Sequence, residues 1–274
     1  MKKYLSLALS LALALSLTAC GGTEDPAPEA ETETETTTIS VAASTTPHAE
    51  ILEVCKPILA EQGITLEINE YTDYVFPNTA VEEGEETANY FQHQPYLDDF
   101  NAERGTHLVS VAGVHVEPMG VYAGKTASLE ELADGAVIAI PNDATNEGRA
   151  LLLLESQGLI KLSEDAGLTA TPKDIAENPK NLEFKEVEAL TLTSILPDVD
   201  LAVINSNYAL GADLNPVEDS LVIESSDSPY VNILAVKDGN ENDPAILALV
   251  DALHSDAVRT FINDTYAGAV VPAF

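Results

Sequence analysis

The sequence predicts a two-lobed α/β protein whose lobes are joined by two crossings of the chain around a central ligand cleft. Three observations lead to this prediction. A strand, a helix and a second strand follow one another within about thirty residues, the pattern of a βαβ unit with a parallel sheet. Polar segments follow several apolar strands, at the strand ends where open parallel sheets bind ligands. The body, from about Ile39 to Phe274, is also somewhat long for one compact domain.

The first expected lobe combines residues 39–118 with residues 232–274. Alternating apolar residues predict its strands, and apolar residues at helical spacing predict its helices. The expected strands cover 39–44, 64–70 and 108–116, and the expected helices cover 49–62, 79–84, 95–104, 243–254 and 256–266. We expect the last two helices to pack back on this lobe.

The second expected lobe covers residues 119–231, between a first crossing at 117–120 and a return crossing in the strand 228–236. Ser128 and Glu131 form a capping-box pattern, which predicts a short helix. The other expected elements are strands at 136–140, 182–187, 199–204 and 220–224, a helix that contains Arg149 and ends near Gly158, and a short helix at 172–177.

The start of the chain has the features of a bacterial export signal. Two lysines precede an apolar run at residues 4–17 that is too short to span a bilayer comfortably. The run ends in Leu17-Thr18-Ala19-Cys20-Gly21, which resembles a lipobox. The resemblance implies a signal peptide at 1–19, a lipid on the Cys20 thiol and an anchored protein on the extracytoplasmic face of the cell membrane. The alternative is an ordinary secretory signal with an accidental cysteine. Residues 20–38 are acidic and poor in apolar residues, so we expect a disordered tether.

Charge and cysteine content exclude several classes of partner. The chain has 12 basic and 46 acidic residues, a formal net charge of −34, so nucleic acid and anionic lipid head groups are poor partners. An anionic ligand would therefore need a specific local cation. Apart from Cys20 the only cysteine is Cys55, in an apolar helical pattern, where a buried and unreactive thiol is expected.

Residues 88–96 gather aromatic rings, an imidazole and amides that could line a pocket. In an extended segment Asn89, Phe91 and His93 would share one face, and Tyr96 would return to them after the bend at Pro95. The alternative is one core aromatic residue followed by a solvated loop.

Polar residues that follow two further strands are candidates for the other end of a ligand. Arg149 lies about one turn into a helix that follows a strand and a polar loop, where a guanidinium could grip a carboxylate. The alternative is a surface arginine paired with one of the many acids. Asn205 follows the strand 199–204 and offers a neutral hydrogen-bonding group. Glu117, at the first crossing, could meet an ammonium group or be a solvated hinge residue.

Five separated segments resemble the methionine-binding lipoproteins, also called the NlpA lipoprotein family. They are residues 72–78 (TDYVFPN), 88–97 (ANYFQHQPYL), 140–149 (IPNDATNEGR), 202–205 (AVIN) and 228–232 (SPYVN). The resemblance extends over about residues 39–274. It implies a periplasmic-binding-protein-like fold and the role of substrate receptor for a methionine ABC importer, with a membrane permease and its ATPase subunits as partners.

The resemblance also implies a ligand site. Tyr74, Phe91, His93 and Tyr96 would surround a thioether side chain, with His93 as a neutral edge. Arg149 would bind the ligand carboxylate, and Asn146, Asn205 and Asn232 would hydrogen-bond its amino and carboxylate groups. We expect Arg149→Ala to abolish amino-acid binding and to leave the fold intact.

The segment Leu192-Thr193-Ser194-Ile195-Leu196 departs from the family pattern, because a proline and an arginine are absent. Selectivity could differ as a result. L-methionine is the favoured ligand, and a methionine-containing dipeptide or another amino acid is the alternative, because relatives in the family bind such dipeptides.

Three other classes of protein are alternatives to a substrate receptor: a metal receptor, an enzyme and a surface scaffold. A metal receptor would need about four converging ligands, whereas the five histidines are scattered along the chain, so we expect no metal site and no cofactor. An enzyme is not expected, because there is no nucleophile elbow, nor any phosphate-binding loop of an ATPase. A surface scaffold would use the acidic tether and bind no small solute.

Overall fold

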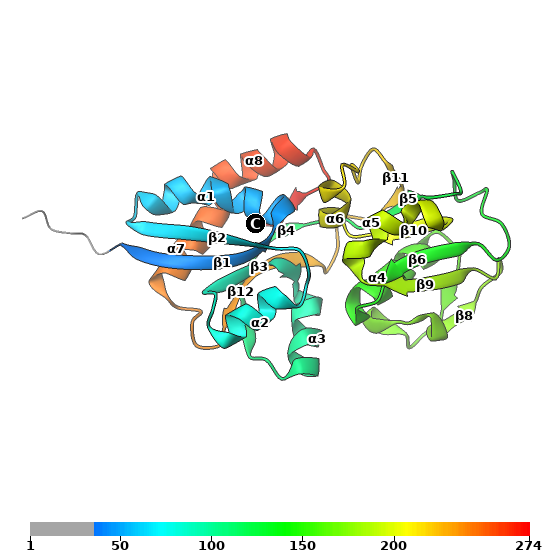
Figure 1. Cartoon of the computed structure of the whole chain (residues 1–274), viewed down its shortest axis with the longest axis horizontal. Coiled ribbons are helices and arrows are strands. Elements are labelled where there is room, and N and C mark those ends of the chain that lie inside the picture. The colour runs from blue at the N-terminus through cyan, green and yellow to red at the C-terminus, as the bar shows by residue number, and fades with distance from the viewer. Residues whose placement is uncertain (1–35) are drawn as a thin grey trace, which may run out of the picture. The chain divides into compact units, whose positions relative to one another are not determined.

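The computed structural model describes residues 36–274, which form two β-sheets with helices packed around each (Figure 1). The expected signal peptide, Cys20 and all but the last three residues of the expected tether lie outside the described residues. The prediction of a two-lobed α/β architecture is confirmed. No helix within residues 36–274 is long and apolar enough to cross a membrane.

The six-stranded sheet begins with the predicted βαβ unit. Strand β1 (Thr37–Ser44), helix α1 (Glu50–Ala60) and strand β2 (Ile64–Tyr71) follow one another, and β1 pairs with β2 in parallel from Thr37 opposite Ile64 to Ser44 opposite Tyr71. The first strand therefore starts two residues earlier than expected. The sheet order is β13-β4-β12-β3-β1-β2, with β3 at Ala88–His93, β4 at Leu108–Val116, β12 at Val231–Lys237 and β13 at Val271–Pro272.

Helices cover both faces of this sheet (Figure 1). Helices α1, α7 (Pro244–Leu253) and α8 (Asp256–Tyr266) share a buried apolar cluster with one face. Helices α2 (Phe76–Glu83) and α3 (Gln94–Arg104) cover the other face, where Val81 and Leu97 pack against Ile233 and Ala235. Burial of apolar side chains on both faces stabilises the sheet.

The five-stranded sheet has the order β11-β5-β10-β6-β9. Its strands are β5 (Gly120–Ala123), β6 (Val137–Pro141), β9 (Glu183–Val187), β10 (Leu201–Ile204) and β11 (Ser220–Ile223). Strand β6 pairs in parallel with both β9 and β10. Helix α4 (Ala144–Ser156) follows β6, and α6 (Ser206–Gly211) follows β10, so both helices begin at the same edge of the sheet.

The chain passes between the two sheets twice. Residues 117–119 connect β4 to β5, and residues 224–230 connect β11 to β12. All strands of the five-stranded sheet lie between these two connections. Glu117 and Glu224 therefore occupy equivalent positions, because each immediately follows the strand that leads into a connection.

The predictions of two short helices in the second lobe are wrong. Residues 128–131 form turns and no helix, because Gly135 and the next strand follow too soon for a helix to extend beyond its costly first turn. Residues 172–177 divide into a 3₁₀ turn at Pro172–Asp174 and the strand β8 (Ile175–Glu177), which pairs with β7 (Lys161–Leu162). The remaining short helix, α5, covers Leu192–Ile195.

Candidate ligand-binding site

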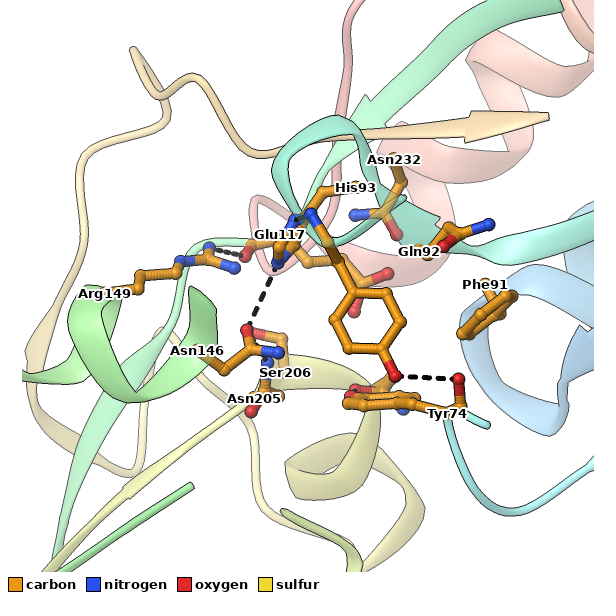
Figure 2. A pocket seen from close by; sticks show the side chains of 12 residues that line it. Tyr74, Phe91, Gln92, His93, Glu117, Asn146, Arg149, Asn205, Ser206 and Asn232 are labelled. Atoms are coloured by element: carbon orange, nitrogen blue, oxygen red, sulfur yellow. Dashed lines mark hydrogen bonds between the residues drawn. The ribbon is translucent and has the colours of Figure 1, made fainter. Parts of the chain in front are cut away.

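A pocket lies between the two sheets and is lined by residues from both lobes (Figure 2). All eight residues predicted to bind ligand line it. The full lining consists of Tyr74, Phe91, Gln92, His93, Tyr96, Glu117, Asn146, Arg149, Asn205, Ser206, Asn207 and Asn232. The tertiary structure thus brings together the predicted aromatic residues of the first lobe and the predicted polar residues, of which Asn146, Arg149 and Asn205 come from the second lobe and Asn232 from the first.

Three aromatic rings form one end of the pocket. The ring centroids of Tyr74, Phe91 and Tyr96 are 5.9–6.1 Å apart in each pair, within the range of favourable aromatic contacts. The Tyr96 hydroxyl donates to the backbone oxygen of Tyr74 at 2.9 Å, which holds two of the rings together. The alternative of a single core aromatic residue with a solvated loop is wrong, because Phe91 and Tyr96 are both buried and both face the pocket.

A β-bulge decides which side chains of β3 reach the pocket. Gln92 pairs with Ile233 of β12 and Tyr90 pairs with Leu234, so Phe91 has no partner in this ladder. The extra residue breaks the alternation of faces, and both Phe91 and Gln92 line the pocket. Asn89, expected on the same face as Phe91, instead hydrogen-bonds Asn78 and Gln92 and does not line the pocket.

His93 joins the two lobes as a neutral imidazole. Its Nδ1 atom accepts from the backbone N–H of Tyr96 at the start of α3, so its Nε2 atom carries the proton and donates to Asn146 Oδ1 at 3.2 Å. Burial, followed by the nearby Arg149, lowers the pKa of His93 to about 3. The imidazole is therefore uncharged at neutral pH.

Helix α4 presents Asn146 and Arg149 on one face, because residues three apart are neighbours on a helix. Asp143 caps the helix by accepting from the backbone N–H of Asn146 at 3.0 Å, and the same carboxylate accepts from the Asn146 side chain at 2.9 Å. Asn146 Oδ1 also accepts from Asn205 Nδ2 at 2.8 Å. These contacts hold the amide of Asn146 in one orientation.

Arg149 is buried, with 3% of its surface exposed, and pairs with Glu224. Its Nε and Nη2 atoms donate to the Glu224 carboxylate at 2.5–3.1 Å, and Nη2 also donates to the backbone oxygen of Glu117 at 2.7 Å. The guanidinium lies over the Tyr230 ring, 4.3 Å from its centroid. None of its hydrogen bonds within residues 36–274 uses Nη1. Arg149 thus pairs with an acid, as one alternative expected, but it does so inside the pocket wall, and its Nη1 atom makes no hydrogen bond to the described residues.

A buried polar cluster behind the pocket consists of three residues that no sequence pattern had linked, His48, His115 and Glu117. The register of the sheet places Asn232 of β12 between His93 of β3 and His115 of β4, and His48 approaches from the turn after β1. Glu117 Oε1 lies 2.8 Å from His115 Nε2 and 3.2 Å from His48 Nε2. The histidines are therefore not all scattered, and Glu117, 6% exposed, is not a solvated hinge residue.

The ligand atoms of His48, His115 and Glu117 lie within 4.8 Å of one another, which makes them a metal-site candidate among the described residues. Their separations are those of hydrogen bonds. The Tyr90 hydroxyl is 2.5 Å from His115 Nδ1, and Asn232 Oδ1 is 3.0 Å from His48 Nε2. Because Asn232 Oδ1 and an ionised Glu117 only accept, each histidine carries its proton on Nε2.

Four residues of the pocket were absent from the predicted set: Gln92, Glu117, Ser206 and Asn207. Asn207 Oδ1 accepts from the Tyr74 hydroxyl at 2.6 Å, and the Ser206 hydroxyl donates to the backbone oxygen of Pro118. Both follow β10 in the segment Asn205-Ser206-Asn207, so their position after a parallel strand was the available signal. Thr193 and Ser194, where the sequence departs from the family pattern, do not line the pocket.

The model of the family described as NlpA lipoprotein matches residues 39–274. The chain belongs to this family. Among NlpA family members, the methionine-binding lipoprotein MetQ of Bacillus subtilis is 45% identical over 238 residues, which cover 85% of this chain and 86% of that protein. Membrane lipoprotein TpN32 of Treponema pallidum is 44% identical over 234 residues, covering 85% of this chain and 87% of that protein.

Solved structures of NlpA-type proteins share the fold. A nutrient-binding protein from Burkholderia cenocepacia, solved bound to methionine, is 44% identical with a TM-score of 0.84, covering 86% of this chain and all of that one. Lipoprotein Tp32 from Treponema pallidum is 43% identical with a TM-score of 0.84, covering 87% of this chain and all of that one. The resemblance inferred from the five sequence segments is confirmed.

Proposed function

We propose that this NlpA family member is a substrate-binding lipoprotein that captures methionine between its lobes and delivers it to an ABC importer. The observation that carries the proposal is the polarity of the pocket. Three aromatic rings form one end, and the other end holds a buried guanidinium whose Nη1 atom makes no hydrogen bond to the described residues. The names of the relatives and the methionine-bound neighbour support the same ligand.

Each of the eight predicted residues takes a role in this proposal. The thioether packs against Tyr74, Phe91 and Tyr96, since sulfur makes favourable contacts with aromatic rings. His93 forms a neutral edge of that end. The carboxylate binds Arg149 through Nη1, and the side-chain amides of Asn146, Asn205 and Asn232 hydrogen-bond the amino and carboxylate groups. None of these roles is catalytic, and the protein acts as a receptor and not as an enzyme.

L-methionine is our favoured ligand, and a methionine-containing dipeptide is the second candidate. A larger cavity adjoins the pocket and shares Tyr74 and Tyr96 with it, so the site has room into which a longer ligand could extend. Six acids, among them Asp73, Asp99 and Asp143, border that cavity, against one cation, Arg104. A second residue with a free carboxylate would meet this acidic border, which favours the single amino acid.

The mechanism that we propose is capture by closure of the lobes, taken as residues 39–118 with 232–274 and residues 119–231. Several side-chain hydrogen bonds already cross between the lobes, among them those from Tyr74 to Asn207, from His93 to Asn146 and from Tyr208 to the backbone oxygen of Thr72. A ligand that contacts Arg149 and the aromatic rings at once stabilises the closed form, because only that form makes both contacts. A membrane permease driven by ATPase subunits then receives the ligand.

The anchor in this proposal is a lipid on Cys20, which holds the protein on the extracytoplasmic face of the cell membrane. The net charge of −34 makes nucleic acid an unsuitable partner.

A ligand screen by thermal unfolding tests the proposal. The purified protein is first stripped of bound ligand by unfolding and refolding. It is then heated with the proteinogenic amino acids, D-methionine, methionine dipeptides and zinc in turn. A ligand at a hundredfold excess over its dissociation constant adds about 2.7 kcal/mol of stability. Stabilisation by methionine or its dipeptides alone is expected. Stabilisation by zinc alone, or by nothing, would contradict the proposal.

A further inference from the structure

The Glu117 carboxylate lies at the pocket wall, and no lysine or arginine within residues 36–274 is at salt-bridge distance from it, although Arg149 lowers its pKa from farther away. Figure 2 shows its side chain running from the region of Arg149 toward Asn232. Arg149 donates to the backbone oxygen of Glu117 and gives its remaining bonds to Glu224. The groups within salt-bridge distance of the Glu117 carboxylate are His48 and His115.

Neither histidine supplies positive charge to this carboxylate. Burial lowers the pKa of His48 to about 4 and that of His115 to about 3, so both are neutral near pH 7. His115 donates its Nε2–H to Glu117 Oε1 and accepts from the Tyr90 hydroxyl at Nδ1, whereas His48 donates its Nε2–H to Asn232 Oδ1 and lies 3.2 Å from Glu117 Oε1. The two imidazoles thus orient the carboxylate without neutralising it. A buried, ionised carboxylate without a counter-charge is costly, unless a ligand supplies that charge.

A second polar atom in the same pocket also has no partner. Asn205 Oδ1 is buried and accepts no hydrogen bond from the described residues, while Asn205 Nδ2 donates to Asn146. Asn205 is 7% exposed and lines the pocket beside Glu117. A buried acceptor is normally satisfied, so this atom points to a donor that arrives with the ligand.

We propose that Glu117, together with Asn205 Oδ1, receives the ammonium group of the amino-acid ligand, and that His48 and His115 are positioning residues for this carboxylate. The inference rests on the proposed function and assigns the end of the ligand that Arg149 does not bind. The pocket then offers one cation and one anion, which matches a zwitterion. Ligands whose nitrogen is acylated or missing are rejected, because they leave Glu117 buried and unpaired.

The same cluster could hold a metal ion, and the distinction is testable. A metal would need lone pairs from both Nε2 atoms, which carry protons in the present hydrogen-bonded arrangement. We therefore favour the ammonium group as the missing cation and use zinc as an arm of the test.

Calorimetric titration of the intact, ligand-stripped protein tests this inference with two ligands. One is L-methionine, and the other is 4-(methylthio)butanoate, which has the same thioether and carboxylate but no amino group. In Glu117→Gln we expect methionine to bind roughly 10- to 100-fold more weakly, the loss of one hydrogen bond to a charged group. The affinity for 4-(methylthio)butanoate should stay unchanged or rise. Phe91→Leu is the matched control and should weaken both ligands by a similar factor.

Several outcomes separate this inference from the proposed function. If the unaltered protein binds neither ligand, the proposed function itself is wrong. If it binds methionine and Glu117→Gln weakens both ligands equally, only the role of Glu117 is overturned. Zinc binding by the unaltered protein that is lost in both His48→Gln and His115→Gln would assign the cluster to a metal instead.

A measurement on the unaltered protein covers the case in which Glu117→Gln does not fold. Burial raises the pKa of Glu117, so the carboxylate takes up a proton more readily than an exposed one as the pH falls. His48 and His115 stay neutral down to about pH 5. The other groups that act on Glu117 are Arg149, the backbone N–H of Asn207, and the hydroxyls of Tyr74, Tyr90 and Tyr266. Methionine affinity should therefore fall as the pH is lowered, while that of 4-(methylthio)butanoate stays level or rises. Equal pH dependence for the two ligands would overturn the inference.

Discussion

His93 and Asn146 lie on opposite lobes, and the Nε2 atom of His93 is 3.2 Å from the Oδ1 atom of Asn146. His93 ends strand β3, and Asn146 lies in the first turn of helix α4. The backbone N–H of Tyr96 selects the tautomer of the imidazole, and the imidazole in turn orients the amide. The bond therefore links the aromatic end of the pocket to the helix that carries Arg149.

Acid stability should depend on His93. Burial lowers the pKa of His93 to about 3, whereas an unfolded histidine titrates near 6.5. Below pH 6.5 the unfolded state thus binds more protons than the folded state. The part of the unfolding free energy that depends on a neutral His93 is therefore complete above pH 6.5 and is lost as the pH falls toward the folded-state pKa. His93→Asn should reduce the pH slope of the unfolding free energy by up to about 1.4 kcal/mol per pH unit.

Urea unfolding at pH 7.5 and pH 5.0 measures this slope. His107→Gln is the control, because its side chain is 69% exposed and lies away from the pocket. A slope that His93→Asn leaves equal to that of the unaltered protein would contradict the neutral, buried state of His93.

Arg149→Ala should destabilise the protein as well as abolish binding, contrary to the expectation from the sequence. The substitution leaves the carboxylate of Glu224, 16% exposed, without its guanidinium. Removing one partner of a buried ion pair costs about 3 kcal/mol or more, and solvent at Glu224 reduces this figure. Chemical denaturation measures the loss. Lys161→Ala breaks the exposed pair with Glu177 and should change stability by less than about 1 kcal/mol.

Glu224→Gln distinguishes the two roles of Arg149. This variant keeps the size and shape of the side chain but removes its negative charge, so it binds the guanidinium of Arg149 more weakly. We expect methionine to bind with equal or higher affinity, because Arg149 has one competing carboxylate fewer. A loss of binding as large as that in Arg149→Ala would instead mean that Glu224 is required to orient the guanidinium.

Tyr74→Phe should weaken methionine binding about fivefold, since it removes an interlobe hydrogen bond of about 1 kcal/mol and keeps the ring. The lost bond is that from the Tyr74 hydroxyl to Asn207 Oδ1 at 2.6 Å. Tyr71→Phe is the matched control, because its hydroxyl bonds Glu86 within the first lobe. Calorimetric dissociation constants compare the two variants. Equal affinities would show that the bond does not contribute to the closed form.

Gly148→Ala should lower stability by about 2 kcal/mol or more and weaken ligand binding, because overpacking forces the backbone to shift. A Cβ atom on Gly148 would lie 2.2 Å from the backbone oxygen of Leu168, and Arg149 is the next residue. Gly211→Ala is the control, since a Cβ atom there meets nothing within 4 Å. Thermal unfolding and methionine titration of both variants check the prediction. A Gly148→Ala protein as stable as Gly211→Ala would mean that the turn at Leu168 can move away without cost.

The sequence by itself determined most of the longer strands and helices and the set of eight residues that meet in the pocket. Strand β4 occupies the expected residues, Leu108–Val116, because alternation of apolar and polar side chains is a local property. The pocket set came from five short segments that resemble one family. Local signals failed where an element was short, as at Ser128, since a capping pattern cannot replace the packing that a one-turn helix needs.

Only the tertiary structure decided what lies beside those eight residues. Sheet register, and not sequence spacing, places His48 next to Glu117, although 69 positions separate them along the chain. The bulge at Phe91 turns Gln92 into the pocket, and the second connection between the lobes brings Glu224 to Arg149. Periodic patterns report the faces of single elements, whereas these contacts depend on how separate elements pack, so the charge balance of the pocket emerges only in the folded chain.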